Sequence, residues 1–361
     1  MTLLRPACVR PAVAVALAAL LAAPAGAGRP VIGADLSSLP RVEAGGGVFR
    51  VRGDTVNAMV ALRDAGLDAV RLRVWHSPAG GECGPAATVG MAKRAHALGL
   101  RVMLDLHYSD TWADPGKQTP PAAWRELPPA TLADSVRAWT RDVLANCVAA
   151  GAPPEWVQLG NEVDAGMLWD AGRLGAGGAN ADGFAALLRA AAEGAREGAP
   201  HVRRIVHFSR GGDAAASAAF FGRLVRLGVP FEIAGLSYYP WWHGSLADLE
   251  RNLDALAHSL GRDVMVVETA HPWTLRAFDS THNPVGEPRQ VGAWPATPRG
   301  QAAFARAVRG AVAGVPSGRG AGVFWWEPAW IAAPGYGSPW ENCALFDSAG
   351  AALPALRAFA R

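Results

Sequence analysis

Three observations in the sequence predict a single (β/α)8 barrel. Eight short runs rich in β-branched and aromatic residues recur from residue 31 onward, and longer Ala-, Leu- and Arg-rich segments of helical period lie between them. No Gly-x-Gly-x-x-Gly turn follows the first run, which argues against a doubly wound nucleotide-binding sheet. The 361 residues are 50% hydrophobic and 18% charged, which provides enough apolar sequence for the core of one large domain.

Expected strands and helices alternate along this domain. The strands are expected at 31–35, 69–74, 101–107, 156–160, 204–208, 233–238, 264–268 and 322–326. The helices are expected at 55–65, 89–98, 132–150, 183–197, 217–227, 246–260 and 300–313. A glycine follows several of these helices and supplies the left-handed residue that closes a helix: Gly66, Gly99, Gly228 and Gly261. We see no linker and therefore expect residues 28–361 to form one catalytic domain.

The first 27 residues have the pattern of a secretory signal peptide. Two arginines precede an apolar stretch at 12–23, and Ala25-Gly26-Ala27 follows it. The apolar stretch is shorter than the ~20 residues of a membrane-spanning helix. We therefore expect a secreted or periplasmic monomer with no membrane association after cleavage. The net charge of +3 comes from scattered arginines, so a nucleic-acid partner is not expected.

Aromatic and charged residues cluster directly after the expected strands. The carboxyl ends of the strands form the active-site face of a (β/α)8 barrel, so these side chains should converge on one mouth. Two glutamates stand at such ends: Glu162 after the fourth strand and Glu268 at the end of the seventh. Hydrolysis of a glycosidic bond needs one carboxylic acid and one carboxylate on either side of the sugar. The pair predicts a glycoside hydrolase, whereas a lone glutamate would more simply be an ion-pair partner.

Three further side chains are expected to assist this pair. Asn161 should bind the sugar 2-hydroxyl, and an arginine of the second strand should keep Glu268 ionised. We assign that arginine as Arg73, although Arg71 has the same parity and remains an alternative. Tyr238 could donate its hydroxyl to Glu268.

The chain has 14 Trp, and many of them follow expected strands. Aromatic faces stack on the apolar faces of sugars, so the tryptophans in the loops are candidate sugar platforms. These candidates are Trp75, Trp112, Trp241, Trp242, Trp273, Trp326, Trp330 and Trp340. Trp124, Trp139 and Trp156 are assigned to packing.

Motifs throughout the chain resemble the endo-β-1,4-galactanases of glycoside hydrolase family 53. The segments that carry the resemblance are GADLS at 33–37, VRLRVW at 70–75, DLHYSDTWADP at 105–115, QLGNE at 158–162, GLSYYPWW at 235–242, VETA at 267–270 and WENCALFD at 340–347. The resemblance implies retaining hydrolysis of β-1,4-galactan or arabinogalactan, such as pectin side chains, with Glu162 as acid/base and Glu268 as nucleophile. Expected substrate contacts are Asn161, Arg73, Asp35, His107, Asp110, Trp112, Tyr238, Trp242 and Trp326.

The same resemblance implies a structural calcium ion, although the chemistry itself requires no cofactor. In bacterial relatives the loops after strands seven and eight can hold calcium, and here Asp279 and Asn283 offer oxygen ligands. His271 stands where many relatives carry Tyr, which departs from the family pattern in this loop. Two other classes remain open from the sequence: another polysaccharide hydrolase of the same clan (a mannanase, xylanase or cellulase), and a barrel that binds sugar without catalysis.

Three cysteines follow the expected cleavage site. Cys83 and Cys343 lie in the loops after strands two and eight, at the same end of the expected barrel, so we expect them to form a disulfide. Cys147 lies near the end of the helix after strand three and should be a free, buried thiol. The alternative is three unpaired thiols that pack as small hydrophobic side chains.

Overall fold

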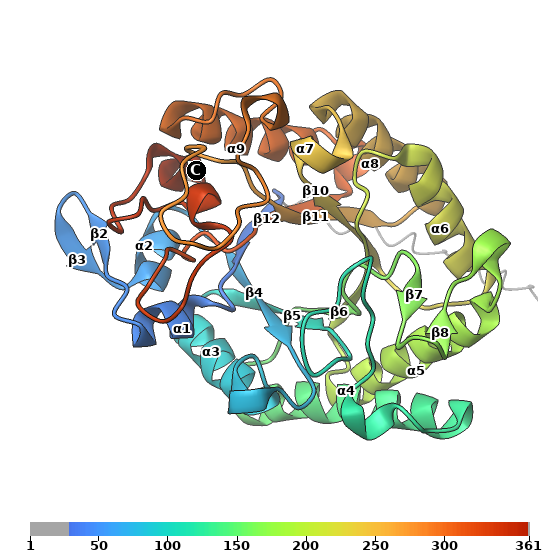
Figure 1. Ribbon diagram of the computed structural model, residues 1–361. Helices are drawn as coiled ribbons and strands as arrows, with labels where there is room; N and C mark the ends of the chain where they lie inside the picture. Colours follow the sequence, from blue (N-terminus) through green and yellow to red (C-terminus); the bar gives the residue numbers. More distant parts are fainter. Residues whose placement is uncertain (1–28, 360–361) are drawn as a thin grey trace, which may run out of the picture.

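Eight parallel strands close into a barrel at the centre of the protein (Figure 1). The computed structural model describes residues 29–359, so the expected signal peptide at 1–27 lies outside the described residues. The strands are β1 (Val31–Asp35), β4 (Ala69–Val74), β5 (Arg101–Leu106), β6 (Trp156–Leu159), β9 (Arg203–Phe208), β10 (Ile233–Tyr238), β11 (Asp263–Thr269) and β12 (Gly320–Trp325). They pair in chain order, and β1 pairs with both β4 and β12 to close the barrel. The predicted fold and its eight strands are confirmed.

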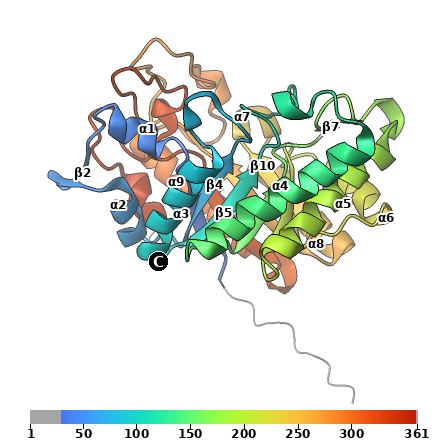
Figure 2. The same cartoon turned by 90° about the horizontal axis from the view of Figure 1, so that it is seen from below.

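Seven α-helices surround the barrel in the described residues (Figures 1 and 2). They are α2 (Ala58–Asp64), α3 (Pro85–Ala97), α4 (Pro129–Ala149), α5 (Ala181–Gly198), α6 (Ala214–Arg226), α8 (Leu246–Leu260) and α9 (Pro298–Ala313). Five of them begin earlier than expected, and three of these five begin at a proline, because the fixed φ and missing N–H of proline suit the first helical position. Within residues 29–359, no helix is long and apolar enough to cross a membrane.

Several short elements that were not predicted lie in the loops at the carboxyl ends of the strands. They are α1 (Leu39–Ala44), the hairpin of β2 (Phe49–Val51) and β3 (Asp54–Val56), the hairpin of β7 (Gly166–Met167) and β8 (Gly172–Arg173), and α7 (Pro240–His243). The helix expected from residue 55 starts only at Ala58, because Asn57 caps it by accepting from the Val60 N–H. After β12 the described chain ends in the 3-10 helix η7 (Pro354–Phe359), which packs against α9 in place of an eighth α-helix.

The barrel interior below the strand ends is a solid apolar plug. Every strand contributes at least one buried residue to it: Val31, Ala69, Met103, Trp156, Ile205, Ile233, Met265, Val267 and Phe324. Glycine makes room for the largest of them, since a Cβ on Gly33 would lie 2.2 Å from the Phe324 ring. A second and larger apolar layer lies between the strands and the helices. The plug closes the lower half of the barrel, so polar chemistry is confined to the upper end.

Candidate active site

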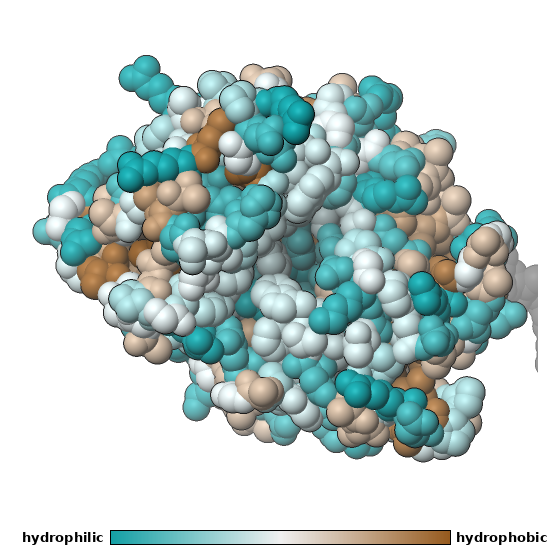
Figure 3. All heavy atoms as spheres, viewed as in Figure 1, coloured by the Kyte–Doolittle hydropathy of each residue, from teal (hydrophilic) through white to brown (hydrophobic). Residues whose placement is uncertain are grey.

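A cavity of about 440 Å³ opens where the carboxyl ends of the strands meet. Figure 3 shows that this face of the molecule is hollowed at its centre. The cavity is lined from the end of β11 and the loops after β5, β6, β10 and β12 by Trp112, Ala113, Asp114, Asn161, Glu162, Tyr239, Trp242, Glu268, Trp326, Trp330, Pro339 and Trp340. The structure therefore brings together six of the site residues expected from the sequence: Asn161, Glu162, Glu268, Trp112, Trp242 and Trp326.

Backbone geometry at the end of β6 presents Glu162. Gly160 and Glu162 both have a left-handed backbone, with φ of 87° and 46°. A non-glycine residue in this region costs about 1–3 kcal/mol, so contacts nearby must hold it. Two contacts from the next strand do so, because the Glu162 N–H donates to His207 Nδ1 (3.3 Å) and the Val163 N–H donates to the His207 carbonyl.

Arg71 holds the second glutamate and ties it to the rest of the barrel. Its buried guanidinium lies 2.8 Å from Glu268 Oε1 and donates to Asp35 (2.9 Å) and Asp105 (2.8 Å). It also donates to Asn161 Oδ1 at 3.0 Å. The assignment of Arg73 to this role is therefore wrong, and the alternative, Arg71, is the arginine that contacts Glu268. Parity could not separate the two residues, because both point inward and only their depth differs.

Arg73 lies at a different depth in the barrel from Arg71 and forms an ion pair with Glu327. It donates to Glu327 (2.9 Å) and to Ser38 (2.9 Å), and the Trp112 ring covers its guanidinium at 4.0 Å. Burial raises the pKa of Glu327 to about 8, with Asp35 adding to the effect. Arg73 therefore does not line the cavity and packs beneath the Trp112 ring, and its contact with substrate stays a prediction.

The two glutamates experience different electrostatic environments. Burial, together with the charge of Glu268, raises the pKa of Glu162 well above its ordinary value. Burial also raises the pKa of Glu268, to about 7, but Arg71 opposes this shift more strongly than it does at Glu162. Two close carboxyl groups titrate as a pair, and the one beside the cation ionises first. The ion pair with Arg71 therefore favours Glu268 as the carboxylate of the pair and Glu162 as the carboxylic acid.

The tyrosine that contacts Glu268 is Tyr239 and not the predicted Tyr238. The Tyr239 hydroxyl donates to Glu268 Oε2 at 3.1 Å, whereas Tyr238 donates to the Gly244 carbonyl and stacks on Phe304 outside the barrel. Side chains alternate along a strand, so Ser237 and Tyr239 point inward and Tyr238 points outward. The prediction that Tyr238 contacts Glu268 is therefore wrong, and the next residue, Tyr239, forms this contact.

Three other expected substrate contacts lie beneath or beside the cavity and do not line it. Asp35 is fully buried against Arg71 and Ser37, and His107 donates to Asp105 and accepts the Ala113 N–H. Asp110 accepts backbone N–H groups at 77 and 122, which joins the loops after β4 and β5. These groups form hydrogen bonds within the protein, and their contacts with substrate stay predictions.

Tryptophans form the walls of the cavity. Trp112 lies parallel to Trp330 at 6.4 Å, and Trp340 packs against Trp242 and Trp326. Trp242 is 55% exposed, which leaves its ring open to solvent at the rim. Trp124 and Trp156 are buried and Trp139 packs on the core, as predicted. The cavity therefore offers several aromatic faces around one pair of carboxyl groups.

The expected metal ligands lie near a third carboxylate that was not predicted. The Asn283 amide donates to Glu341, and Asp279 accepts the backbone N–H groups of Thr281 and Ser338. Asn283 Oδ1 and Glu341 Oε2 are buried and have no hydrogen-bond partner. Within residues 29–359, however, no three His, Cys, Asp or Glu side chains form a group that could hold a metal ion.

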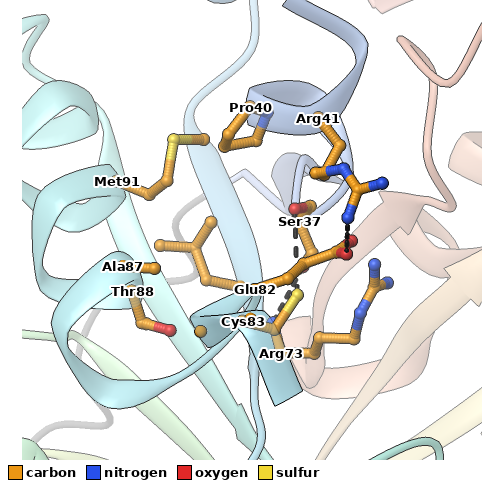
Figure 4. A pocket seen from close by; sticks show the side chains of 12 residues that line it. Ser37, Pro40, Arg41, Arg73, Glu82, Cys83, Ala87, Thr88 and Met91 are labelled. Carbon is orange, nitrogen blue, oxygen red and sulfur yellow. Dashed lines mark hydrogen bonds and ion pairs between the residues drawn. The ribbon is translucent and has the colours of Figure 1, made fainter. Parts of the chain in front are cut away.

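The expected Cys83–Cys343 disulfide is not formed, and the three described cysteines are free and buried. Cys83 lies in a second cavity of about 250 Å³, where its thiol faces the Ser37 carbonyl (Figure 4). Cys343 packs on the other side, with its carbonyl accepting from Trp325 and Gln301 between β12 and α9. The two loops share one end of the barrel, but the Cys83 thiol faces Ser37, in the segment after β1, and not Cys343. The prediction of a free, buried Cys147 is confirmed.

Sequence reasoning missed several polar residues that surround the glutamates. His207 and Ser237 form hydrogen bonds that lead to Glu162, and Gln158 connects Arg71 with Asp105. Inward parity on β6, β9 and β10 was the available signal, since a polar residue at an inward position near a strand's carboxyl end faces the site. Glu327, directly after β12, could have been found in the same way.

Comparisons with known proteins agree with this geometry. The chain matches the model of Glycosyl hydrolase family 53 over residues 31–359. It is 35% identical to the arabinogalactan endo-β-1,4-galactanase of Cellvibrio japonicus, with 91% of this chain and 90% of that protein covered. The Ignisphaera aggregans GH53 catalytic domain superposes with a TM-score of 0.86 at 34% identity, over 91% of this chain and 95% of that one. One of two fungal β-1,4-galactanases superposes with a TM-score of 0.82 at 32% identity, over 92% and 99%.

Replacing Tyr239 by Phe should lower kcat by roughly 10- to 100-fold, because a hydrogen bond to a charged group contributes about 1.5–3 kcal/mol. Steady-state kinetics on the polysaccharide substrate measures the effect. Tyr238→Phe is the matched control, since its hydroxyl reaches only the Gly244 carbonyl, and kcat should stay within about twofold of the wild type. Equal losses in the two variants would contradict the assignment.

Proposed function

Because the chain belongs to glycosyl hydrolase family 53, we propose that it is a retaining endo-β-1,4-galactanase with Glu162 as acid/base and Glu268 as nucleophile. The observation that carries the proposal is the pair of carboxyl groups in one cavity, of which only Glu268 lies beside a buried arginine. Galactan or arabinogalactan as substrate is supported by the activity named for the relatives that match most of this chain.

In the proposed first step, Glu268 attacks the anomeric carbon while Glu162 transfers its proton to the departing glycosidic oxygen. The carbon–oxygen bond breaks, and an ester bond to Glu268 forms. In the second step, Glu162 removes a proton from water, the water oxygen attacks the same carbon, and Glu268 leaves as a carboxylate. Arg71 and the Tyr239 hydroxyl stabilise Glu268 whenever it carries charge.

Other residues of the cavity suit a chain of sugar units. Asn161 uses its amide group to donate to the Ala113 carbonyl, and this contact leaves one N–H for a sugar hydroxyl. The tryptophans of the cavity provide flat apolar faces on which sugar rings stack. A cavity bounded by one strand end and the loops after four other strands, with the Trp242 ring exposed at its rim, fits binding within a polymer, which supports endo action.

We also propose that the protein acts as a secreted or periplasmic monomer after removal of residues 1–27. The support is the arrangement of two arginines, an apolar stretch at 12–23 and Ala25-Gly26-Ala27. Sequencing the amino terminus of the exported protein tests the cleavage, and a mature protein that retains residues 1–27 would refute it.

Variants of the two glutamates should separate their roles. Glu268→Gln should abolish turnover on galactan and on aryl galactosides, because no nucleophile remains. Glu162→Gln should lose much less activity on aryl substrates with good leaving groups, since these need little protonation. Kinetics with both substrate types measures this, and proton NMR should show the β anomer as the first product. Aryl rescue of Glu268→Gln, or an initial α anomer, would contradict the assignment.

A structural calcium ion in the loops after β11 and β12 is a further proposal. The orphaned oxygens of Asn283 and Glu341 and the adjacent Asp279 are oxygen donors of the kind that calcium prefers. Main-chain carbonyls and water would have to complete the about six to eight ligands. The ion would stabilise the loops and take no part in the chemistry.

Calcium should therefore raise the melting temperature of the protein, and a chelator should lower it, by several degrees. Differential scanning calorimetry with calcium, magnesium or chelator measures the shift, and Asn283→Ala should remove it. The same melting temperature under all conditions would exclude the ion.

A further inference from the structure

We propose that His207, acting through Ser237, determines which oxygen of Glu162 carries the catalytic proton. The proposal rests on the acid/base role proposed for Glu162. His207 lies on β9 and Ser237 on β10, both are fully buried, and neither lines the cavity. Both are therefore positioning residues that act on the substrate only through Glu162.

The surroundings of His207 Nδ1 select its tautomer. Two N–H donors lie within hydrogen-bonding distance of this nitrogen: the Glu162 backbone N–H at 3.3 Å and the Gln158 side-chain amide at 3.0 Å, which is also 3.2 Å from the Gly160 carbonyl. The orientation of Gln158 is itself fixed, because its nitrogen donates to Asp105 at 2.5 Å and its oxygen accepts from Arg71. With two donors directed at it, Nδ1 is an acceptor, so the ring proton of the neutral imidazole is on Nε2.

The other neutral tautomer, with the ring proton on Nδ1, is incompatible with these contacts. A proton on Nδ1 could donate only to Asn161 Oδ1, at 3.1 Å, and that oxygen already accepts from Arg71 and lies 3.2 Å from the Gln158 amide nitrogen. The same proton would face the two N–H donors from Glu162 and Gln158. Burial and the charge of Arg71 lower the pKa of His207 well below its ordinary value, so the doubly protonated ring is also disfavoured.

A directed chain of hydrogen bonds follows from this tautomer. His207 Nε2–H donates to Ser237 Oγ at 2.8 Å, and the Ser237 hydroxyl then donates to Glu162 Oε1 at 2.7 Å. Oε1 is thus an acceptor, and a proton placed on it would be repelled by the Ser237 hydroxyl proton. The other oxygen, Oε2, receives no hydrogen bond from the part of the chain that the structure describes. The proton that reaches the glycosidic oxygen is therefore carried by Oε2.

Loss of this chain has a kinetic signature that depends on the leaving group. Without the Ser237 hydroxyl the Glu162 carboxyl group loses the contact that fixes its orientation, and its proton is no longer confined to Oε2, so transfer to a poor leaving group slows. An aryl leaving group that departs as an anion needs no proton and should be insensitive. A structural defect, by contrast, would slow every substrate alike.

The test compares kcat/KM on galactan and on a series of aryl β-galactobiosides of falling leaving-group pKa. Ser237→Ala should lose about tenfold or more on galactan and less than about twofold on the dinitrophenyl substrate. His207→Asn, whose amide is too short to replace Nε2–H, should behave in the same way. His207→Gln, which can place an N–H near Ser237, should recover most of the activity on galactan. Thermal melting establishes that each variant is folded.

A pH profile supplies an independent readout. The Ser237 hydroxyl stabilises the carboxylate form of Glu162, so Ser237→Ala should move the alkaline limb of kcat/KM to higher pH. Glu268, Asp164 and Arg71 also face Glu162 and are unchanged in the variant. Around His207 the unchanged charged or titratable groups are Arg71, Asp105, His107 and His243.

Two controls distinguish failure of this proposal from failure of the proposed function. Glu162→Gln should show the same leaving-group dependence in stronger form, and Tyr239→Phe, which acts on the nucleophile, should lose activity on all substrates. If Glu162→Gln shows the dependence but Ser237→Ala loses activity equally across the series, the role of His207 and Ser237 is overturned. If wild-type protein does not cleave galactan, or Glu162→Gln lacks the dependence, the proposed function fails first.

Discussion

The buried guanidinium of Arg71 is the contact on which the rest of the site depends. It lies on β4 and reaches Asp35 of β1, Asp105 of β5 and Glu268 of β11. Removing one partner of a buried pair costs about 3–5 kcal/mol, because it leaves an uncompensated charge. Three carboxylates surround the Arg71 guanidinium and keep it protonated. The direct ion pair with Arg71 favours the ionised form of Glu268 over that of Glu162. The proposed roles of Glu162 as acid/base and Glu268 as nucleophile rest on this geometry.

The sequence predicted the barrel well because each strand is bounded by local signals. Alternating helical and strand periods, and glycines after helices, identified all eight strands within a residue or two. It also placed Glu162 and Glu268 correctly, since residues at strand ends share one face whatever the details of packing. Helix starts were less accurate where the proline at the first position was overlooked, as at Pro85 and Pro129.

Predictions failed where the outcome depends on depth, parity or the path of a loop. Arg71 and Arg73 have the same parity, and only three-dimensional packing shows which one reaches Glu268. Tyr238 and Tyr239 differ by one position, which reverses the side of the sheet that each one faces. Cys83 and Cys343 lie at the same end of the barrel, yet no sequence rule describes how the intervening segment fills the space between loops.

The residues of the apolar plug, which stabilise the barrel, are different from the residues that line the cavity above it. Residues from all eight strands, including Trp156 and Phe324, complete the lower barrel without any contribution from the upper loops. Mutations that lengthen or replace those loops can therefore accumulate during evolution without disturbing the packing that holds the strands together. Segments that are themselves anchored in the larger apolar layer are less free to change, as at the β7–β8 hairpin, where Met167 is fully buried.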